Sequence, residues 1–399
     1  MLLAGCGGGG GASSPGAPPP TAAFFASWTL APQDLTEGLP GQPHVAPVVV
    51  TDLTIREVAH LSVGGDSLRI RLSNRFGTSA VTFTAVHVAR GAGVFAIEPT
   101  SDRAVTFGGS TTVTIAPGAE ATSDSVALPV SPFSDVTVSL YAPNATALTT
   151  GHKSTTSESI DSSGNVATAA AIGGNPTPIL YWITEVDVAS ALATNVVAAF
   201  GDSITDGSQS TPGAHRSYPE QLAVRASGSG SPRIAVVNAG IGGNRWLQDD
   251  PGPAGISRFD RDVLAVQGVT HTVILLGIND FQVARVFGPS PVMADALIAA
   301  ASQAISHATA HNVKVLLGTL TPYKGSALFN ADDEAQRQAY NAWVRGNKDV
   351  AAVVDFDAAL RDPNDPQSLA PQYASPDHLH PDDAGYAAMA NLVSLAALR

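Results

Sequence analysis

The sequence predicts two domains of different fold class: an all-β sandwich or jelly roll, followed by an α/β domain with a parallel sheet. Three observations lead to this prediction. The chain has 399 residues, which is long for a single domain. Its first half contains many short runs in which apolar and polar residues alternate, as in strands with one buried face. Its second half alternates apolar strand-like runs with helix-like stretches, which is typical of a parallel sheet covered by helices.

The composition is that of a packed globular protein. Hydrophobic residues make up 44% of the chain and charged residues 14%, which disfavours a disordered chain. The net charge of −13 argues against nucleic acid as a partner and against electrostatic binding to an anionic membrane. Cys6 is the single cysteine, so neither an intrachain disulfide nor a cysteine-based metal site can form. The oligomeric state does not follow from the sequence.

Residues 1–23 are predicted to be a signal-peptide remnant and a Gly/Pro-rich linker. Leu3-Ala4-Gly5-Cys6 resembles the lipobox of bacterial lipoproteins, which makes Cys6 a predicted lipidation site and membrane tether. The alternative is a chance tetrapeptide, because the five preceding residues are too few for a signal peptide. If the lipobox is real, we expect the true translation start to lie upstream. The protein would then be secreted or extracytoplasmic, anchored to a bacterial membrane.

The first domain is predicted to span residues 24–193 and to consist of short strands. Alternating runs at 68–72, 81–83, 113–115 and 136–140 are separated by Gly- and Pro-containing turns. Arginines on the polar face of the first run (Arg69, Arg71, Arg75) are expected to be solvated, or alternatively to contact a ligand. His87 and His152 have no partner at a recognisable spacing, so we expect structural or surface roles for both. The domain either binds carbohydrate or buttresses the second domain.

The second domain is predicted to span residues 194–399. The expected strands are 196–200, 233–238, 271–276, 312–318 and 350–354. The expected helices are 218–226, 291–311, 333–345 and 381–398. In such sheets, active sites form at the carboxyl ends of the strands.

The segments that follow these strands are rich in chemically useful residues. The first strand leads to Gly201-Asp202-Ser203, and the third to Gly277-Ile278-Asn279-Asp280. The second leads to the glycine-rich stretch 238–245, and the fifth leads by a loop to 377–380. All four segments are therefore expected at one edge of the sheet.

These segments supply the parts of a nucleophilic catalyst. A serine hydroxyl needs a base, usually histidine, and the base needs an acid that orients it. We assign Ser203 as nucleophile, His380 as base and Asp377 as the acid, with His378 as a competing base. The backbone N–H of Ser203, a glycine N–H of the second segment and the Asn279 side chain can stabilise an oxyanion. Asp202 is expected to hold the turn.

Each segment also has a simpler explanation. Gly-Asp-Ser is common in turns, and Asn279-Asp280 can cap a helix. The segment 377–380 can hold a metal ion, although no further ligands are evident nearby. The occurrence of all the segments in order, each after a strand, favours catalysis. We expect no organic cofactor and no metal.

At these residues the sequence resembles the SGNH/GDSL hydrolase superfamily. The family's blocks correspond to 201–204, to the glycine in 238–245, to 277–280 and to Asp377-x-x-His380. The resemblance implies a flavodoxin-like three-layer α/β/α domain. It also implies an oxyanion hole of Ser203, Gly243 and Asn279, with Gly242 as the alternative glycine. A secreted bacterial subgroup similar to xylanolytic esterases resembles this chain over further segments of both domains.

The sequence thus predicts a serine esterase that hydrolyses carboxylic esters through an acyl-enzyme. Its expected substrate is a small-molecule or polysaccharide ester, with deacetylation of acylated carbohydrates as the leading expectation. One alternative is a lipase or a general short-chain esterase, in which Trp246-Leu247 lines an apolar acyl pocket. Another is a non-catalytic glycan-binding lipoprotein, or a chain whose β-domain is the main glycan-binding part.

Overall fold

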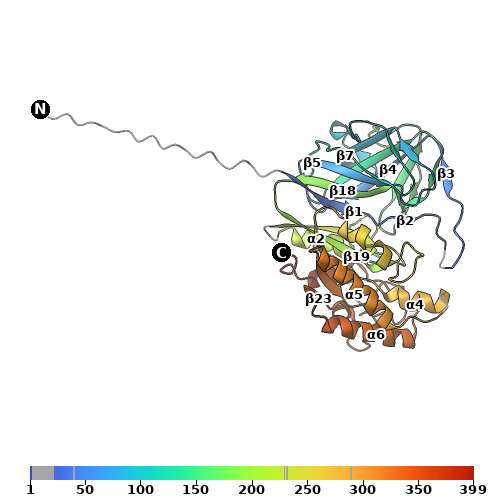
Figure 1. Cartoon of the computed structure of the whole chain (residues 1–399), viewed down its shortest axis with the longest axis vertical. Coiled ribbons are helices and arrows are strands. Elements are labelled where there is room, and N and C mark those ends of the chain that lie inside the picture. The colour runs from blue at the N-terminus through green and yellow to red at the C-terminus, as the bar shows by residue number, and fades with distance from the viewer. Residues whose placement is uncertain (2–21, 39–40, 229, 231, 288–289) are drawn as a thin grey trace.

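The protein is described from a computed structural model that covers residues 1, 22–38, 41–228, 230, 232–287 and 290–399. Cys6 and most of the segment 1–23 lie outside these residues. Figure 1 shows an all-β domain, coloured blue to green, packed against an α/β domain coloured yellow to red. Among the helices that the structure describes, none combines the length and the apolar composition that a membrane crossing requires.

The first domain consists of antiparallel sheets, as predicted. The larger sheet contains, in spatial order, β16 (Pro176–Thr177), β15 (Ser159–Ser163), β4 (Leu53–His60), β12 (Asp135–Ala142), β7 (Ala85–Gly93) and β8 (Ala96–Ile97), with β9 (Arg103–Ala104) beside β7. The smaller sheet contains β1 (Ala23–Thr29), β18 (Ile183–Ser190), β5 (Ser67–Ser73) and β11 (Glu120–Thr122). Side chains of both sheets, such as Ile70 and Val138, share one buried core, which makes this domain a sandwich.

Short strands complete the β-domain. They pair as β10 (Val113–Ile115) with β6 (Val81–Phe83), β13 (Thr146–Leu148) with β3 (Val48–Val50), and β14 (Thr150–Lys153) with both β17 (Ile179–Tyr181) and β2 (Gln33–Asp34). A single turn of 3-10 helix, η1, covers Pro99–Ser101.

The second domain is built on a five-stranded parallel sheet. Its spatial order is β20 (Arg233–Gly240), β19 (Thr194–Gly201), β21 (Val269–Leu275), β22 (Lys314–Gly318) and β23 (Ala352–Val354). This 2-1-3-4-5 order is the flavodoxin-like arrangement, so the prediction of the fold class is confirmed. The interior strand β19, which lies between β20 and β21, is fully buried from Val196 to Phe200, as its continuous apolar run predicts.

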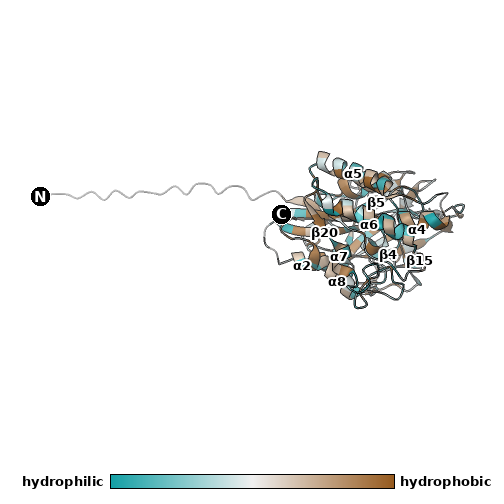
Figure 2. Ribbon diagram, turned by 90° about the horizontal axis from the view of Figure 1, so that it is seen from below, coloured by the Kyte–Doolittle hydropathy of each residue, from teal (hydrophilic) through white to brown (hydrophobic). Residues whose placement is uncertain are grey.

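Helices cover both faces of the sheet. They are α1 (Ser203–Asp206), α2 (Tyr218–Ala226), α3 (Gly255–Phe259), the π-helical turn η2 (Asp260–Leu264), α4 (Ile278–Phe287), α5 (Ala294–Ala310), α6 (Ala331–Gly346), α7 (Phe356–Leu360) and α8 (Asp383–Leu392). Helix α8 packs with α2 and α7, while α5 packs with α3 and α6. Figure 2 shows apolar residues along β20 and on the surrounding helices.

The last helix differs from its prediction. The sequence predicts a helix over 381–398, but α8 begins at Asp383, because the Asp382 side chain caps it by accepting the Gly385 N–H. His380 therefore lies in the loop before the cap and not in the first turn of the helix.

Three strands end at the same level of the sheet. Gly201 of β19 is the register partner of Gly240 in β20 and of Leu275 in β21. The segments after these strands consequently begin side by side, as expected for the carboxyl edge of a parallel sheet.

The two domains share polar contacts as well as apolar packing. Arg69 donates to Asp187 of its own domain and to the Gln267 side chain of the second domain, at 2.7 and 2.8 Å. Arg71 pairs with Glu185, whose carboxylate accepts the N–H of Gln267. These two arginines are therefore interface residues, and the expectation that they are simply solvated is wrong. Their strand lies at the junction, which a sequence pattern does not reveal.

Candidate active site

Ser203 is presented by a tight turn at the end of β19. A Cβ atom on Gly201 would lie 2.3 Å from the carbonyl oxygen of Leu275, so only glycine fits where the chain turns. The Asp202 side chain caps α1 by accepting the Ile204 N–H at 3.0 Å. Asp202 thus holds the turn, as predicted, and burial raises the pKa of its carboxyl to about 7.

The predicted nucleophile, base and acid lie in one hydrogen-bonded chain. The Ser203 Oγ is 2.8 Å from His380 Nε2, and His380 Nδ1 is 2.7 Å from Asp377 Oδ2. The other carboxylate oxygen of Asp377 accepts the Ser375 hydroxyl and the N–H groups of Leu379 and His380. Burial favours the neutral acid, but these hydrogen bonds outweigh it and lower the pKa of Asp377 below its usual range.

The competing base, His378, does not take part in this chain. The Ser203 hydroxyl and the Oδ2 atom of Asp377 both form hydrogen bonds with the His380 ring. His378 instead lies against the loop after β22, where a Cβ on Gly325 would be 3.0 Å from its ring. The geometry therefore favours His380 over His378.

The second segment after a strand approaches the serine turn from β20. The Ile241 N–H donates to the Gly201 carbonyl at 3.2 Å. Gly243 has a positive φ of 74°, and a Cβ there would lie 2.9 Å from Pro251 Cγ. Gly242 has open space at that position. A backbone constraint thus requires glycine at 243 and not at 242.

Asn279 is tied to this same segment. Its Nδ2 donates to the Asn244 carbonyl at 3.1 Å, and its Oδ1 accepts from Gln282 at 3.0 Å. The side chain is buried and its amide orientation is set on both sides. The structure thus holds Asn279 beside the glycine segment, as the predicted oxyanion hole requires.

Asp280 fastens to α4 the two residues that directly follow the glycine segment. Its two carboxylate oxygens accept the N–H groups of Trp246 and Leu247 at 2.8 and 3.1 Å. Burial raises the pKa of this carboxyl to about 7. Trp246 is fully buried, packs near Phe200 and donates to the Leu276 carbonyl, so it belongs to the core and does not line an acyl pocket.

Arg258 supports the site in a way that the sequence does not predict. Its guanidinium is fully buried and donates to the carbonyls of Gly201 and Ala239 at 2.7 and 2.8 Å, and to Asn244 Oδ1 at 2.9 Å. It also pairs with Asp262 at 3.0 Å. Arg258 therefore joins the ends of β19 and β20 to the glycine segment. The one sequence signal is its four-residue spacing from Asp262, which surface helices share.

The β-domain also reaches this edge of the sheet. Glu37 accepts the Gly252 N–H at 2.6 Å, in the loop whose Pro251 lies against Gly243. His152 is buried and pairs with Asp206, the last residue of α1, at 3.0 Å. Burial opposes protonation of His152, but the carboxylate outweighs it and raises the pKa of the imidazole. His152 thus has a partner after all, across the domain junction.

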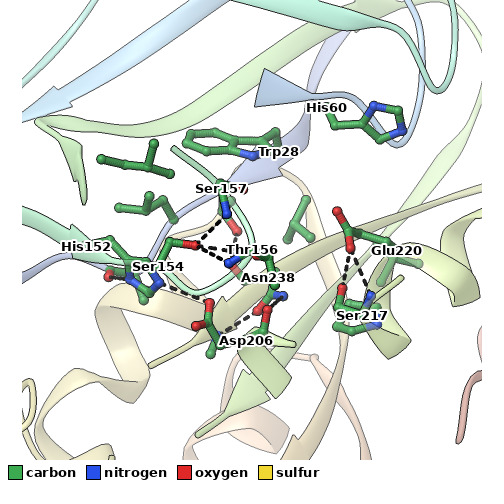
Figure 3. A pocket seen from close by; sticks show the side chains of 18 of the residues that line it. Trp28, His60, His152, Ser154, Thr156, Ser157, Asp206, Ser217, Glu220 and Asn238 are labelled. Atoms are coloured by element: carbon green, nitrogen blue, oxygen red, sulfur yellow. Dashed lines mark hydrogen bonds and ion pairs between the residues drawn. The ribbon is translucent and has the colours of Figure 1, made fainter. Parts of the chain in front are cut away.

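A pocket opens along this junction (Figure 3). It encloses about 80 Å³. Trp28, His60 and His152 line it from the β-domain, and Asp206 and Asn238 from the α/β domain. Its lining includes Asp206, the last residue of the helix that Ser203 begins, but neither Ser203 nor His380.

Comparison with known proteins identifies the second domain. Residues 197–393 match the model of a family described as GDSL-like lipase/acylhydrolase. Among curated proteins, no relative matches the chain in sequence.

Several solved structures resemble the same half of the chain. A GDSL-like lipase from Bacteroides thetaiotaomicron is 21% identical over 51% of this chain and 87% of its own, with a TM-score of 0.39. A variant acetyl-xylooligosaccharide esterase from Geobacillus is 23% identical over 50% of this chain and 93% of its own, with a TM-score of 0.40. An acetyl xylan esterase is 23% identical over 49% and 96%, with a TM-score of 0.40. At such identities and TM-scores, these similarities are too weak to transfer a substrate.

Replacing Arg258 should damage both the stability and the site. We expect Arg258→Met to lower the free energy of unfolding by about 3–5 kcal/mol, because the carbonyls at the ends of β19 and β20 lose a buried charged partner. Denaturant unfolding measures this change. The control is Arg90→Met, which removes an exposed ion pair with Glu98 and should have little effect. Equal destabilisation by the two variants would contradict the role given to Arg258.

The Glu37 contact should make stability depend on pH. Burial, helped by nearby Asp250 and Asp34, raises the pKa of Glu37 from 4.5 to about 7 in the folded chain. Ionisation of Glu37 therefore destabilises the folded state. This destabilisation is absent below pH 4.5, where the group is protonated in both states, and complete above pH 7. The variant Glu37→Gln keeps an acceptor for Gly252 and cannot ionise.

We expect the melting temperature of Glu37→Gln, relative to wild type, to rise between about pH 5 and pH 8. Thermal melts across this range measure the difference, with Glu98→Gln as an exposed control. A difference that stays constant with pH would show that Glu37 does not ionise in this window.

Proposed function

Because residues 197–393 belong to the GDSL-type (SGNH) hydrolase superfamily and the chain is thus a carboxylic ester hydrolase, we propose that it cleaves esters through an acyl-enzyme on Ser203. The observation that carries this proposal is the hydrogen-bonded chain from Ser203 through His380 to Asp377, with distances of 2.8 and 2.7 Å. The order of these residues matches the roles that nucleophilic catalysis needs.

In the first step, the Ser203 Oγ attacks the ester carbonyl and its proton passes to His380 Nε2. Asp377 holds the Nδ1–H of the ring and stabilises the imidazolium that forms. The tetrahedral intermediate then expels the alcohol, which takes the proton from His380. In the second step, water attacks the acyl-enzyme, His380 accepts its proton, and the acid leaves as Ser203 recovers its hydrogen.

The negative oxygen of each tetrahedral intermediate needs donors that are already in place. We assign this role to the N–H groups of Ser203 and Gly243 and to the Asn279 amide. The glycine segment is supported by Arg258 and Asp280, so these donors move little during the reaction. A preorganised hole of this kind is worth roughly 3–4 kcal/mol for each donor.

The proposed substrates are acetylated or other short-chain esters, with acylated carbohydrates first. The apolar acyl pocket that would favour a lipase was predicted from Trp246 and Leu247; Trp246 is buried in the core, while Leu247 is half-buried. The loss of Trp246 from such a pocket favours a small acyl group over a long one. It does not identify the alcohol, for which the β-domain and the predicted extracytoplasmic location support a carbohydrate.

Replacing the nucleophile tests the proposed reaction. We expect Ser203→Ala to lower kcat on a chromogenic acetate ester by at least about 1,000-fold, while Ser227→Ala, at the end of α2, stays close to wild type. A serine-directed phosphonate should label wild type at Ser203 in peptide mass spectrometry. Retained hydrolysis in Ser203→Ala would exclude the acyl-enzyme.

Rates on acetylated xylan and on esters of increasing chain length separate an acetylesterase from a lipase.

We also propose that the chain is an extracytoplasmic lipoprotein anchored through Cys6. The support is the tetrapeptide 3–6 and the linker composition that follows it. In a bacterium that expresses the chain behind a complete signal peptide, an alkyne-tagged fatty acid should label the wild type and not Cys6→Ala. Equal labelling of the two proteins, or none, would overturn the anchor.

A further inference from the structure

A cluster of two histidines and an aspartate bridges the domains away from the catalytic chain. His60 ends β4 and Asp135 begins β12, and the two are register partners in the antiparallel sheet. His215 comes from the α/β domain, in the loop between α1 and α2. Each of the three offers one nitrogen or oxygen atom, and these atoms lie within 4.8 Å of one another.

The individual contacts in the cluster are close. His60 Nδ1 is 2.7 Å from Asp135 Oδ1. The rings of His60 and His215 stack with centroids 3.7 Å apart and planes 12° from parallel. The three side chains are 20%, 40% and 33% exposed, so an ion can reach them from solvent.

A second carboxylate orients the histidine of the α/β domain. Glu220 Oε1 is 3.0 Å from His215 Nδ1, while its Oε2 accepts the hydroxyl and N–H of Ser217 and caps α2. This leaves Nε2 as the ring nitrogen of His215 that is free to bind an ion. Histidines that bind metals usually have such a carboxylate on the other nitrogen. Figure 3 shows His60 and Glu220 on the same side of the junction pocket.

The backbone also holds His215 in an unusual position. Its φ is 55°, in the left-handed region that residues other than glycine seldom adopt. The surrounding loop must stabilise this conformation, and the conformation brings the imidazole onto the ring of His60. Such outliers tend to occur where a side chain has a specific task.

We propose that His60, Asp135 and His215 bind a divalent transition-metal ion, Zn²⁺ in the first instance, that clamps the two domains. Two imidazoles and a carboxylate form a donor set that suits Zn²⁺, and water completes its four-coordinate shell. Bonds of about 2.0–2.2 Å place ligand atoms about 3.3 Å apart. To reach that geometry, the His60 and Asp135 atoms, now 2.7 Å apart, must separate, and one imidazole must turn out of the stack so that both rings direct a nitrogen at the ion.

An ion at this position would act on the loop that links the catalytic elements. The loop 207–217 begins after α1, whose first residue is Ser203. Within it, the N–H and hydroxyl of Thr211 donate to Asp383, the first residue of α8, at 2.8 and 2.7 Å. The clamp therefore restrains the connection between the nucleophile's helix and the helix that follows His380. The ion would have a structural role, separate from the ester chemistry.

Calorimetric titration of the chelator-treated, full-length chain with ZnCl₂ tests the proposal. We expect one ion per chain and a raised melting temperature. His60→Ala and His215→Ala should each weaken binding at least about 100-fold. Glu220→Gln keeps the helix cap and should weaken it about 10–100-fold. The matched control is His87→Ala, since His87 pairs with Asp102 at 2.9 Å and does not belong to the cluster.

A second measurement uses wild type alone and so does not depend on the folding of the variants. With one equivalent of Cu²⁺, electron paramagnetic resonance should show coupling to two imidazole nitrogens. No Zn²⁺ binding by wild type, or unchanged binding in folded His60→Ala and His215→Ala, would overturn the proposal. A Cu²⁺ spectrum without two coupled imidazole nitrogens would also overturn it.

Discussion

The buried guanidinium of Arg258 is the interaction on which the catalytic edge depends. Strands β19 and β20 end with carbonyl groups that have no further strand to pair with, and buried carbonyls without partners are costly. Arg258 satisfies one carbonyl from each strand and holds Asn244 in the glycine segment. Burial lowers the pKa of its guanidinium to about 10, so the group stays charged at neutral pH. The serine turn and the glycine segment thereby keep a fixed spacing.

The β-domain contributes to this edge and is more than an appended module. It contacts the α/β domain at two separate places: Glu37 reaches the loop beside Gly243, and His152 pairs with Asp206 at the end of the serine helix. Glutamate and aspartate side chains recur at the junction, and burial raises the pKa of several of them, including Glu185 and Glu37. A junction with so many buried acids depends on accurate pairing, because an unpaired buried charge destabilises the folded state. Restraints that hold the domains together, including the proposed ion, would therefore also preserve the site.

Much of the architecture was predictable because period and composition are local properties. The apolar run of β19, the capped helix α2 and the alternation in β5 each appear in a few consecutive residues. The end of α8 and the short helices α3, α4 and α7 were not predicted, since caps and tertiary packing decide such boundaries. The candidate site was predictable to the extent that its residues follow strands. The roles of Arg258 and His152 were missed because the partners that tie them to the serine turn, Gly201 and Asp206, lie 57 and 54 residues away in the chain.

By itself, the sequence determined two domain classes, the set of reactive groups and the edge of the sheet at which they meet. Only the tertiary structure places His380, and not His378, beside Ser203, and shows that the backbone requires glycine at 243 and not at 242. It also moved Trp246 from a pocket wall to the core, and it brought His60 and His215 together across the junction. The reason is physical. A side chain carries its chemistry wherever it lies, but its partners and its burial depend on segments that become neighbours only when the strands have taken their order.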